Sequence, residues 1–125
     1  MPHNVAFHPQ EGLIIARLIG PANLPTLLEF LDEVIKTARE ANCYRILTDM
    51  RAAELKLSLV DIYALPGLVL KAAVRIDLNA YAAKRALVTS ANQEEWQFYE
   101  TVSRNRSHNV RLFHDIEEAK KWLLE

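Results

Sequence analysis

Two residues of opposite charge follow a predicted strand over residues 44–48. They are Asp49 and Arg51, which stand two positions apart. Ligands of open α/β sheets bind beyond the carboxyl ends of the strands. A carboxylate and a guanidinium at such a place can hold a polar ligand or a charged group of a partner protein. The alternative is a local ion pair or a turn-forming aspartate that anchors the loop.

A serine stands where a phosphate could be accommodated. Ser58 precedes an apolar helical stretch and has Asp61 three positions later, which is the pattern of an N-terminal cap. Free backbone N–H groups and the helix dipole favour a phosphate on a serine at this position. Ser58 therefore joins Asp49 and Arg51 as a candidate contact for a polar ligand or partner, although a plain cap needs no such role.

The helical stretch that runs from Leu59 to Leu78 has more apolar residues than one buried helix face needs. The pair Pro66-Gly67 is predicted to break it into two pieces. We expect part of its surface to form a dimer contact or, as the second choice, the wall of an apolar ligand groove. The residues assigned to this surface are Tyr63, Leu65, Pro66, Leu68 and Val69. The alternative is that both pieces bury everything against the sheet.

A short basic cluster follows in the last third of the chain. Its members are Arg104, Arg106, His108 and Arg111. Such a cluster could bind a phosphate or an acidic partner surface. The alternative is that these cations lie near a helix C-terminus simply because the helix dipole favours them there.

Other catalytic chemistry has no pattern to support it. The four histidines lack metal-ligand spacing, and Cys43, the only cysteine, is expected to be a small buried hydrophobe. Three glycines cannot build a glycine-rich phosphate loop. Trp96, Tyr99 and Trp122 are expected in the core. We therefore expect no metal, no cofactor and no enzymatic activity.

The elements that must position these residues alternate regularly. Residues 5–8 and 13–19 are predicted to form an antiparallel hairpin around Gly12, and Gly20-Pro21 is expected to end its second strand. Three further strands are predicted at residues 44–48, 85–89 and 110–113. A helix is predicted from the cap Asn23 to about Ala41, another over 94–107 with the caps Asn92 and Glu95, and a final one with the caps Asp115 and Glu118. Parallel strands need such helical crossovers. The prediction is an α/β fold: a mostly parallel five-stranded sheet with an antiparallel N-terminal edge strand, flanked by helices.

The totals set further bounds. A chain of 125 residues fits a single domain, predicted to span residues 1–125. A net charge of −1 argues against a nucleic-acid partner. The apolar region 57–83 has four charged residues, so no membrane insertion is expected. With no signal peptide and one cysteine, the predicted location is the cytoplasm.

Several segments together resemble the STAS-like, or SpoIIAA-like, family. They are the hairpin that ends at Gly20, residues 46–51 (ILTDMR), residues 85–89 (RALVT), and the tail 109–119 (NVRLFHDIEEA) with Trp122-Leu123. The resemblance implies a sheet flanked by helices and a regulatory role in protein–protein interaction.

The resemblance also implies a particular switch. In the family's anti-sigma-factor antagonists, a serine at the start of the helix after the third strand is phosphorylated. The residues that follow Asp49 here are Met50, Arg51, Ala52 and Ala53, so that position has no serine, and the nearest one is Ser58. We therefore expect a non-catalytic regulatory or protein-interaction domain, as a homodimer and with a possible regulatory protein partner. The alternative is a carrier of a small apolar molecule in a groove beside the Leu59 to Leu78 segment.

Overall fold

A five-stranded sheet forms the centre of the computed structural model, which describes residues 3–90 and 95–125. The strands are β1 (His3–His8), β2 (Leu13–Leu18), β4 (Arg45–Asp49), β6 (Lys84–Val88) and β7 (Asn109–Phe113), in the order β1-β2-β4-β6-β7. Strand β1 is antiparallel to β2, and the other neighbours are parallel. The predicted sheet, with its antiparallel N-terminal edge strand, is confirmed.

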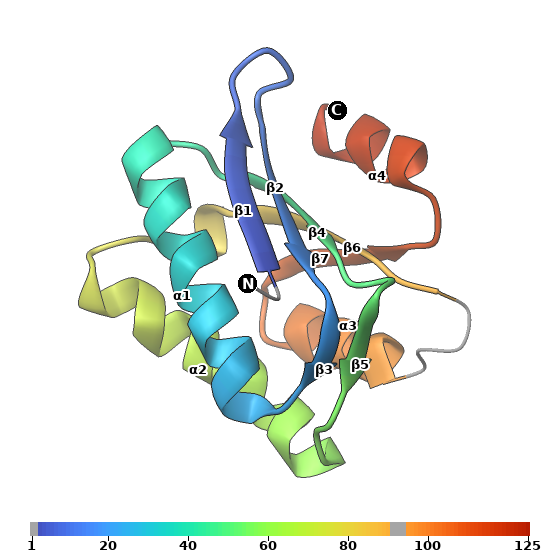
Figure 1. The fold of residues 1–125 in the computed structure, drawn as a ribbon. Coiled ribbons are helices and arrows are strands. Elements are labelled where there is room, and N and C mark those ends of the chain that lie inside the picture. The colour runs from blue at the N-terminus through green and yellow to red at the C-terminus, as the bar shows by residue number, and fades with distance from the viewer. Residues whose placement is uncertain (1–2, 91–94) are drawn as a thin grey trace.

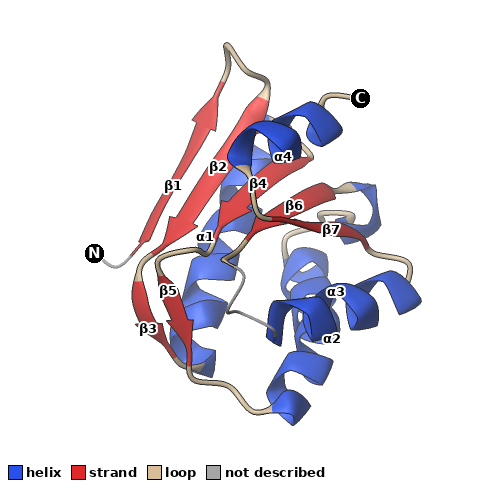
Figure 2. Ribbon diagram, turned by 90° about the vertical axis from the view of Figure 1, so that its right-hand side faces the viewer, coloured by secondary structure: helices blue, strands red, loops and turns tan. Residues whose placement is uncertain are grey.

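Helices cover the two faces of the sheet unequally. Helices α1 (Leu24–Ala41), α2 (Leu59–Arg75) and α3 (Glu95–Asn105) lie on one face, and α4 (Ile116–Leu123) lies on the other (Figures 1 and 2). Side chains alternate between these faces along each strand. Leu87 of β6 packs in the larger core under α1 to α3, whereas Ala86 and Val88 pack under α4.

Two short strands were missed. The chain continues past Gly20 into β3 (Gly20–Ala22), which pairs in parallel with β5 (Ala53–Leu55) and forms a small second sheet. Gly20 has a φ of 84°, a left-handed conformation that glycine adopts without strain, and this conformation redirects the strand. Three-residue strands show too little alternation to be recognised. This small sheet lies beyond the ends of β2 and β4, and the chain continues from β3 into α1 and from β5 into α2 (Figure 2).

The predicted break at Pro66-Gly67 is wrong, because α2 is one continuous helix. Pro66 has no N–H to donate to the carbonyl of Ile62, and it lies inside the helix. The helix continues because its apolar face is held against the core, with Leu65 and Val69 buried on either side of the proline. The predicted end at Leu78 was three residues late, since α2 ends at Arg75.

The caps of α1 and α4 lie where the sequence places them, whereas α3 differs from its predicted range. Asn23 caps α1 by accepting a hydrogen bond from the Thr26 N–H, and Asp115 caps α4 by accepting one from the Glu117 N–H. Helix α3 is shorter than predicted and begins at Glu95, and the predicted cap Asn92 lies outside the described residues. A 3-10 turn, η1 (Ala80–Ala82), precedes β6.

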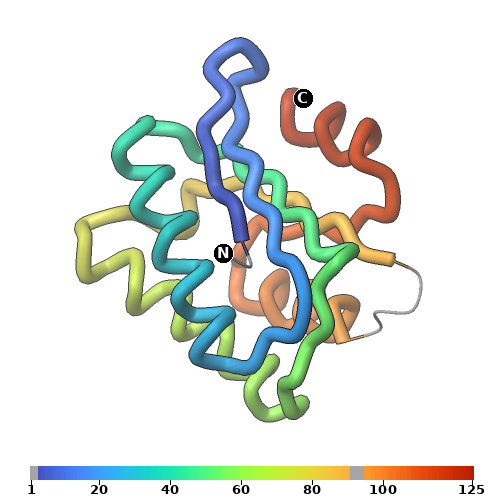
Figure 3. The backbone as a smooth tube through the Cα atoms, in the orientation of Figure 1, coloured from blue at the N-terminus to red at the C-terminus, as the bar shows by residue number. Residues whose placement is uncertain are grey.

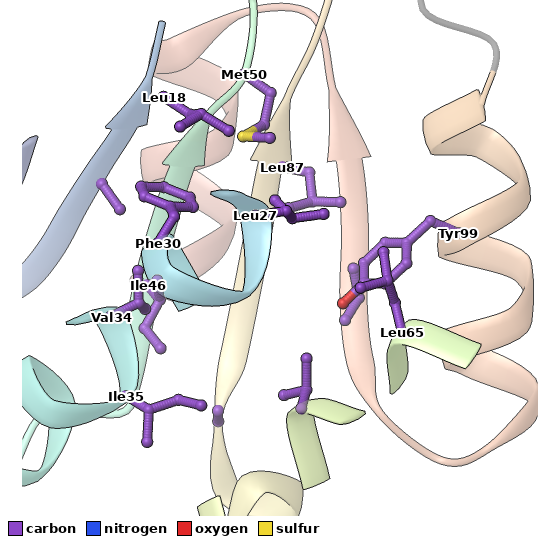
Figure 4. Close-up of a cluster of buried hydrophobic side chains, with 14 of the residues drawn as sticks. Leu18, Leu27, Phe30, Val34, Ile35, Ile46, Met50, Leu65, Leu87 and Tyr99 are labelled. Carbon is purple, nitrogen blue, oxygen red and sulfur yellow. The ribbon is translucent and has the colours of Figure 1, made fainter. Parts of the chain in front are cut away.

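The β1–β2 turn and the C-terminal end of α4 lie at the same end of the molecule (Figure 3). Lys120 of α4 donates a hydrogen bond to Glu11 in that turn, with a distance of 2.8 Å between Nζ and Oε1. At the centre of the larger core, Phe30 of α1 is completely buried (Figure 4). Trp96 and Tyr99 are buried as predicted, and so is Cys43. Trp122, also expected in the core, is only partly buried and packs at the margin of the smaller core under α4.

Candidate functional site

Asp49 and Arg51 form a close ion pair at the carboxyl end of β4. The Nε of Arg51 lies 3.0 Å from Oδ1 of Asp49, and its Nη2 lies 3.0 Å from Oδ2. The backbone N–H of Arg51 also donates to Oδ1, at 3.1 Å. The Asp49 side chain is only 7% exposed, while that of Arg51 is 42% exposed. The local ion pair that the sequence left open is present, and the outer edge of the Arg51 guanidinium faces solvent.

A second arginine extends this charged group. The Nε of Arg17, on the adjacent strand β2, lies 3.9 Å from Oδ2 of Asp49. Burial acts to raise the pKa of Asp49, but the hydrogen bonds from Arg51 and the positive charges of Arg51 and Arg17 outweigh it and hold that pKa below its usual 3.8. The pair with Asp49 also raises the pKa of Arg51.

Replacing Asp49 with asparagine is expected to remove part of the stability of the fold at neutral pH. A carboxylate whose pKa is lower in the folded state stabilises the fold above its unfolded pKa, and this contribution is lost as the pH falls through the folded pKa. We expect Asp49→Asn to cost about 1–3 kcal/mol near pH 7, where a charged hydrogen-bonded pair is broken. Urea unfolding at neutral and acid pH would measure this cost. If the unchanged protein and Asp49→Asn differ by the same free energy of unfolding at neutral pH and in strong acid, the Asp49 carboxylate does not stabilise the fold through its charge.

Ser58 is exposed and begins α2. Its hydroxyl accepts a hydrogen bond from the Asp61 N–H at 3.1 Å, and the Asp61 carboxylate accepts one from the Ser58 N–H at 3.2 Å. The predicted cap is therefore formed as a complete capping box. No serine follows Asp49 directly, since the next residues are Met50, Arg51, Ala52 and Ala53. The intervening segment is the short strand β5, after which Ser58 is the residue at the start of the helix.

The first two turns of α2 expose large apolar side chains beside Ser58. Leu59 is 63% exposed, Val60 is 77% exposed and Tyr63 is 56% exposed. The guanidinium of Arg106 lies 4.6 Å from the centre of the Tyr63 ring, in the geometry of a cation–π contact. We call Leu59, Val60 and Tyr63 the α2 apolar end. Scattered apolar side chains are ordinary on a surface, but three neighbouring ones mark a candidate contact surface.

The five residues predicted for a dimer or groove surface separate in the structure. Tyr63 is exposed and Leu68 is half-buried, but Leu65, Pro66 and Val69 are buried. Leu65, Pro66 and Val69 are therefore not exposed to a second copy of the chain, because an uninterrupted helix turns them into the core, and their assignment to an apolar groove stays a prediction. Figure 4 shows Leu65 close to Tyr99 of α3. Leu59 and Val60, which were not selected, are the more exposed residues.

The basic cluster does not form one surface. His108 is buried, and burial together with the charges of Arg85 and Arg106 lowers its pKa. Arg106 lies over Tyr63, whereas Arg111 lies over Phe113 on β7. The side chains therefore have separate neighbours, which sequence spacing could not show.

Two small cavities lie under α1 and α2. One, of about 30 Å³, is lined by Val69, Ala73 and Leu78, and the other, of about 20 Å³, by Leu65, Trp96 and Tyr99. Both are also lined by Arg85 of β6, a buried residue that sequence reasoning did not select as a site. The signal was available, since an arginine interrupts the apolar face of a central strand.

The described residues provide neither a metal-binding cluster nor a helix that could span a membrane. Within residues 3–90 and 95–125, no group of three or more histidine, cysteine, aspartate or glutamate side chains could hold a metal ion. None of the helices in the described part of the chain has both the length and the apolar character to cross a membrane.

The chain has the SpoIIAA-like, or STAS-like, fold. It is similar to an uncharacterised protein of the DUF3478 family from Shewanella loihica, with a TM-score of 0.61 and 17% identity over 97% of this chain and 91% of that one. It is also similar to the anti-sigma factor antagonist SpoIIAA in its unphosphorylated form, with a TM-score of 0.54 and 16% identity over 98% of this chain and 96% of that one. No protein-family model and no curated protein sequence matches the chain.

Proposed function

We propose that this chain is a non-catalytic regulatory domain that acts by binding protein, and that the α2 apolar end is its contact surface. The observation that carries the proposal is the exposure of three neighbouring large apolar side chains, Leu59, Val60 and Tyr63, at the start of a helix whose inner face is buried in the core. The likeness to SpoIIAA, an anti-sigma factor antagonist, supports a role in partner binding. The proposed partner is a regulatory protein, and the proposed location is the cytoplasm.

The first assembly that we propose for this surface is a homodimer, in which the α2 apolar ends of two copies of the chain pack together. An apolar helix end can pack against its own copy about a two-fold axis, and two-fold dimers are the commonest oligomers. Tyrosine is enriched in the cores of protein interfaces, where its ring contributes apolar area and its hydroxyl a hydrogen bond.

Replacing Val60 with glutamate is expected to convert the dimer into a monomer. A charge at the centre of the α2 apolar end would be desolvated in the dimer, and truncating or charging a central interface residue weakens binding by about 2 kcal/mol or more, which is roughly 30-fold. Light scattering across a concentration series would measure the change. Val74→Glu is the matched control, because Val74 is 66% exposed on the same helix but lies four turns further along. A monomer at every concentration for the unchanged protein would exclude the dimer.

The regulatory partner has its own test. A photo-crosslinking residue at position 63 should capture one particular protein from the host in repeated experiments. Val60→Glu should prevent that capture. Asp49, Arg51 and Ser58 stay proposed as polar contacts for this partner. If capture is unchanged in both Val60→Glu and Arg51→Ala, neither surface binds it.

The second candidate function is a carrier of a small apolar molecule. The two cavities under α1 and α2 favour it, because one lies beside Val69, Ala73 and Leu78 and the other lies beside Leu65, all within the predicted region. Native mass spectrometry of the protein from its own host would show the added mass of a carried molecule. An unliganded mass would contradict the carrier.

A further inference from the structure

A buried arginine lies on the central part of the sheet. Arg85 belongs to β6 and is 8% exposed, so more than nine-tenths of it is out of water. Its neighbour Leu87, two positions on, packs in the larger core, so Arg85 faces the same side, under the helices. An arginine is rarely so buried unless its charge is paired.

Nothing in the described part of the chain neutralises this charge. No aspartate or glutamate within residues 3–90 and 95–125 forms an ion pair with Arg85, and its buried Nη2 has no hydrogen-bond partner. The ring of Tyr99 lies 5.8 Å from the guanidinium carbon and offers a cation–π contact. The ring leaves the Nη2 donor without an acceptor, which is costly in a buried site.

A second donor without a partner lines the same cavity. Trp96 of α3 is 3% exposed, and its indole Nε1 has no hydrogen-bond partner among the described residues. Arg85 and Trp96 both line the cavity of about 20 Å³. Both side chains can only donate through these nitrogens. The cavity therefore has two unfilled donors, one of them positively charged, and the matching ligand group is an anionic acceptor.

The neighbouring cavity indicates what is attached to that acceptor. It has a volume of about 30 Å³ and shares Arg85 and Leu31 with the first cavity. Apart from Arg85, its lining is almost wholly aliphatic and aromatic, with Val69 and Ala73 of α2 among the residues. A ligand that fills both spaces has an acidic group beside Arg85 and a short apolar tail under α2.

We propose that Arg85 and Trp96 form a buried binding site for a small aliphatic monocarboxylic acid. The carboxylate accepts hydrogen bonds from Arg85 Nη2 and Trp96 Nε1, and the tail lies between α1, α2 and the sheet. The site gives the carrier function a ligand class, and it rests on that second candidate and not on the protein-binding surface.

The size of the cavities limits the ligand. Roughly 10–15 Å³ of such space holds one water molecule, so the two cavities together accommodate a carboxylate and a few carbon atoms. A nucleotide, a sugar phosphate or a long-chain lipid does not fit without displacement of α2. Butyrate is therefore the probe of choice, with acetate as the shorter acid and butyramide as the uncharged analogue of the same shape.

The indole N–H of Trp96 allows a direct test. In ¹H–¹⁵N spectra, titration with sodium butyrate should shift the Trp96 indole resonance and leave that of Trp122, which lies on α4, in place. Acetate should bind about tenfold more weakly, since each buried methylene contributes about 0.8 kcal/mol. Butyramide should bind at least tenfold more weakly because it lacks the charge. Equal binding of acetate, chloride and butyrate would overturn the apolar part of the proposal, and no shift of the Trp96 resonance would overturn the site.

Two variants separate the site from general effects on folding. Arg85→Met should weaken butyrate binding at least tenfold, as followed by the same Trp96 resonance. Trp96→Phe keeps an aromatic ring and removes only the donor, and calorimetry should show weaker binding. Val60→Glu changes the protein-binding surface alone and should bind butyrate as the unchanged protein does. Full binding by Arg85→Met would overturn the role of the guanidinium, whatever the outcome for the dimer.

Discussion

Phe30→Ala is expected to lower the free energy of unfolding by about 3–5 kcal/mol. Phe30 is completely buried at the centre of the larger core, on the face of α1 that contacts the sheet (Figure 4). Its ring meets the His3 ring of β1 edge to face, with 5.7 Å between ring centres. Truncation therefore removes apolar contacts from both α1 and the edge strand and leaves a cavity that a close-packed core cannot fill.

Phe98→Ala is the matched control for this loss. Phe98 lies on α3 and is 36% exposed, so the same chemical change there should cost much less. Urea unfolding of the two variants would measure the difference. Since a domain of this kind is stabilised by about 5–15 kcal/mol, Phe30→Ala should lose a large part of its stability and Phe98→Ala should not. Equal losses would mean that the core is not centred on α1.

The main sheet was predictable because its signals are long and redundant. Residues 44–48 and 85–89 are apolar runs between helical segments, and a parallel sheet needs helical crossovers. The caps at Asn23, Ser58 and Asp115 mark three helix starts, and each forms the expected side-chain contact with a backbone N–H. These features depend on local sequence, so no knowledge of distant contacts was needed.

The errors arose where packing outweighs a local rule. Pro66 removes a backbone hydrogen bond in α2, but Leu65 and Val69 hold the surrounding turns against the core, and the helix continues. The strands β3 and β5 exist because they pair with each other, although they are 30 or more residues apart in the chain. Neither Gly20-Pro21 nor residues 53–55 shows a strand pattern alone.

The candidate site was predictable only in part, for the same physical reason. Asp49 and Arg51 are two positions apart, and their ion pair follows from that spacing. The contact between Arg106 and Tyr63 joins α2 to the end of α3, which sequence spacing does not reveal. Arg85 and Trp96 line the same cavity only because α3 packs over β6, which sequence spacing likewise does not reveal.

Arg85→Met is expected to keep or raise the stability of the protein when no carboxylic acid is present. Removing one partner of a buried ion pair typically costs about 3–5 kcal/mol, whereas replacing buried charges by apolar side chains of similar size is often neutral or stabilising by about 1–4 kcal/mol. Arg85 has no ion-pair partner within the described residues, and its Nη2 is unsatisfied, so the second case applies. Methionine adapts its shape to the apolar lining left by the arginine stem.

Thermal unfolding with and without butyrate tests both the stability of Arg85→Met and its loss of butyrate binding. A ligand that binds only the folded protein stabilises it by RT ln(1 + [L]/Kd), about 2.7 kcal/mol at a hundredfold excess over Kd. Butyrate should therefore raise the melting temperature of the unchanged protein and leave that of Arg85→Met where it is. Arg85→Lys keeps the charge and loses the planar fork of donors, so it should respond less than the unchanged protein. A loss of about 3–5 kcal/mol in Arg85→Met without butyrate would mean that the guanidinium has a partner within the chain. In that case the donors of Arg85 and Trp96 have a structural role in the core, and the cavity does not bind a carboxylate.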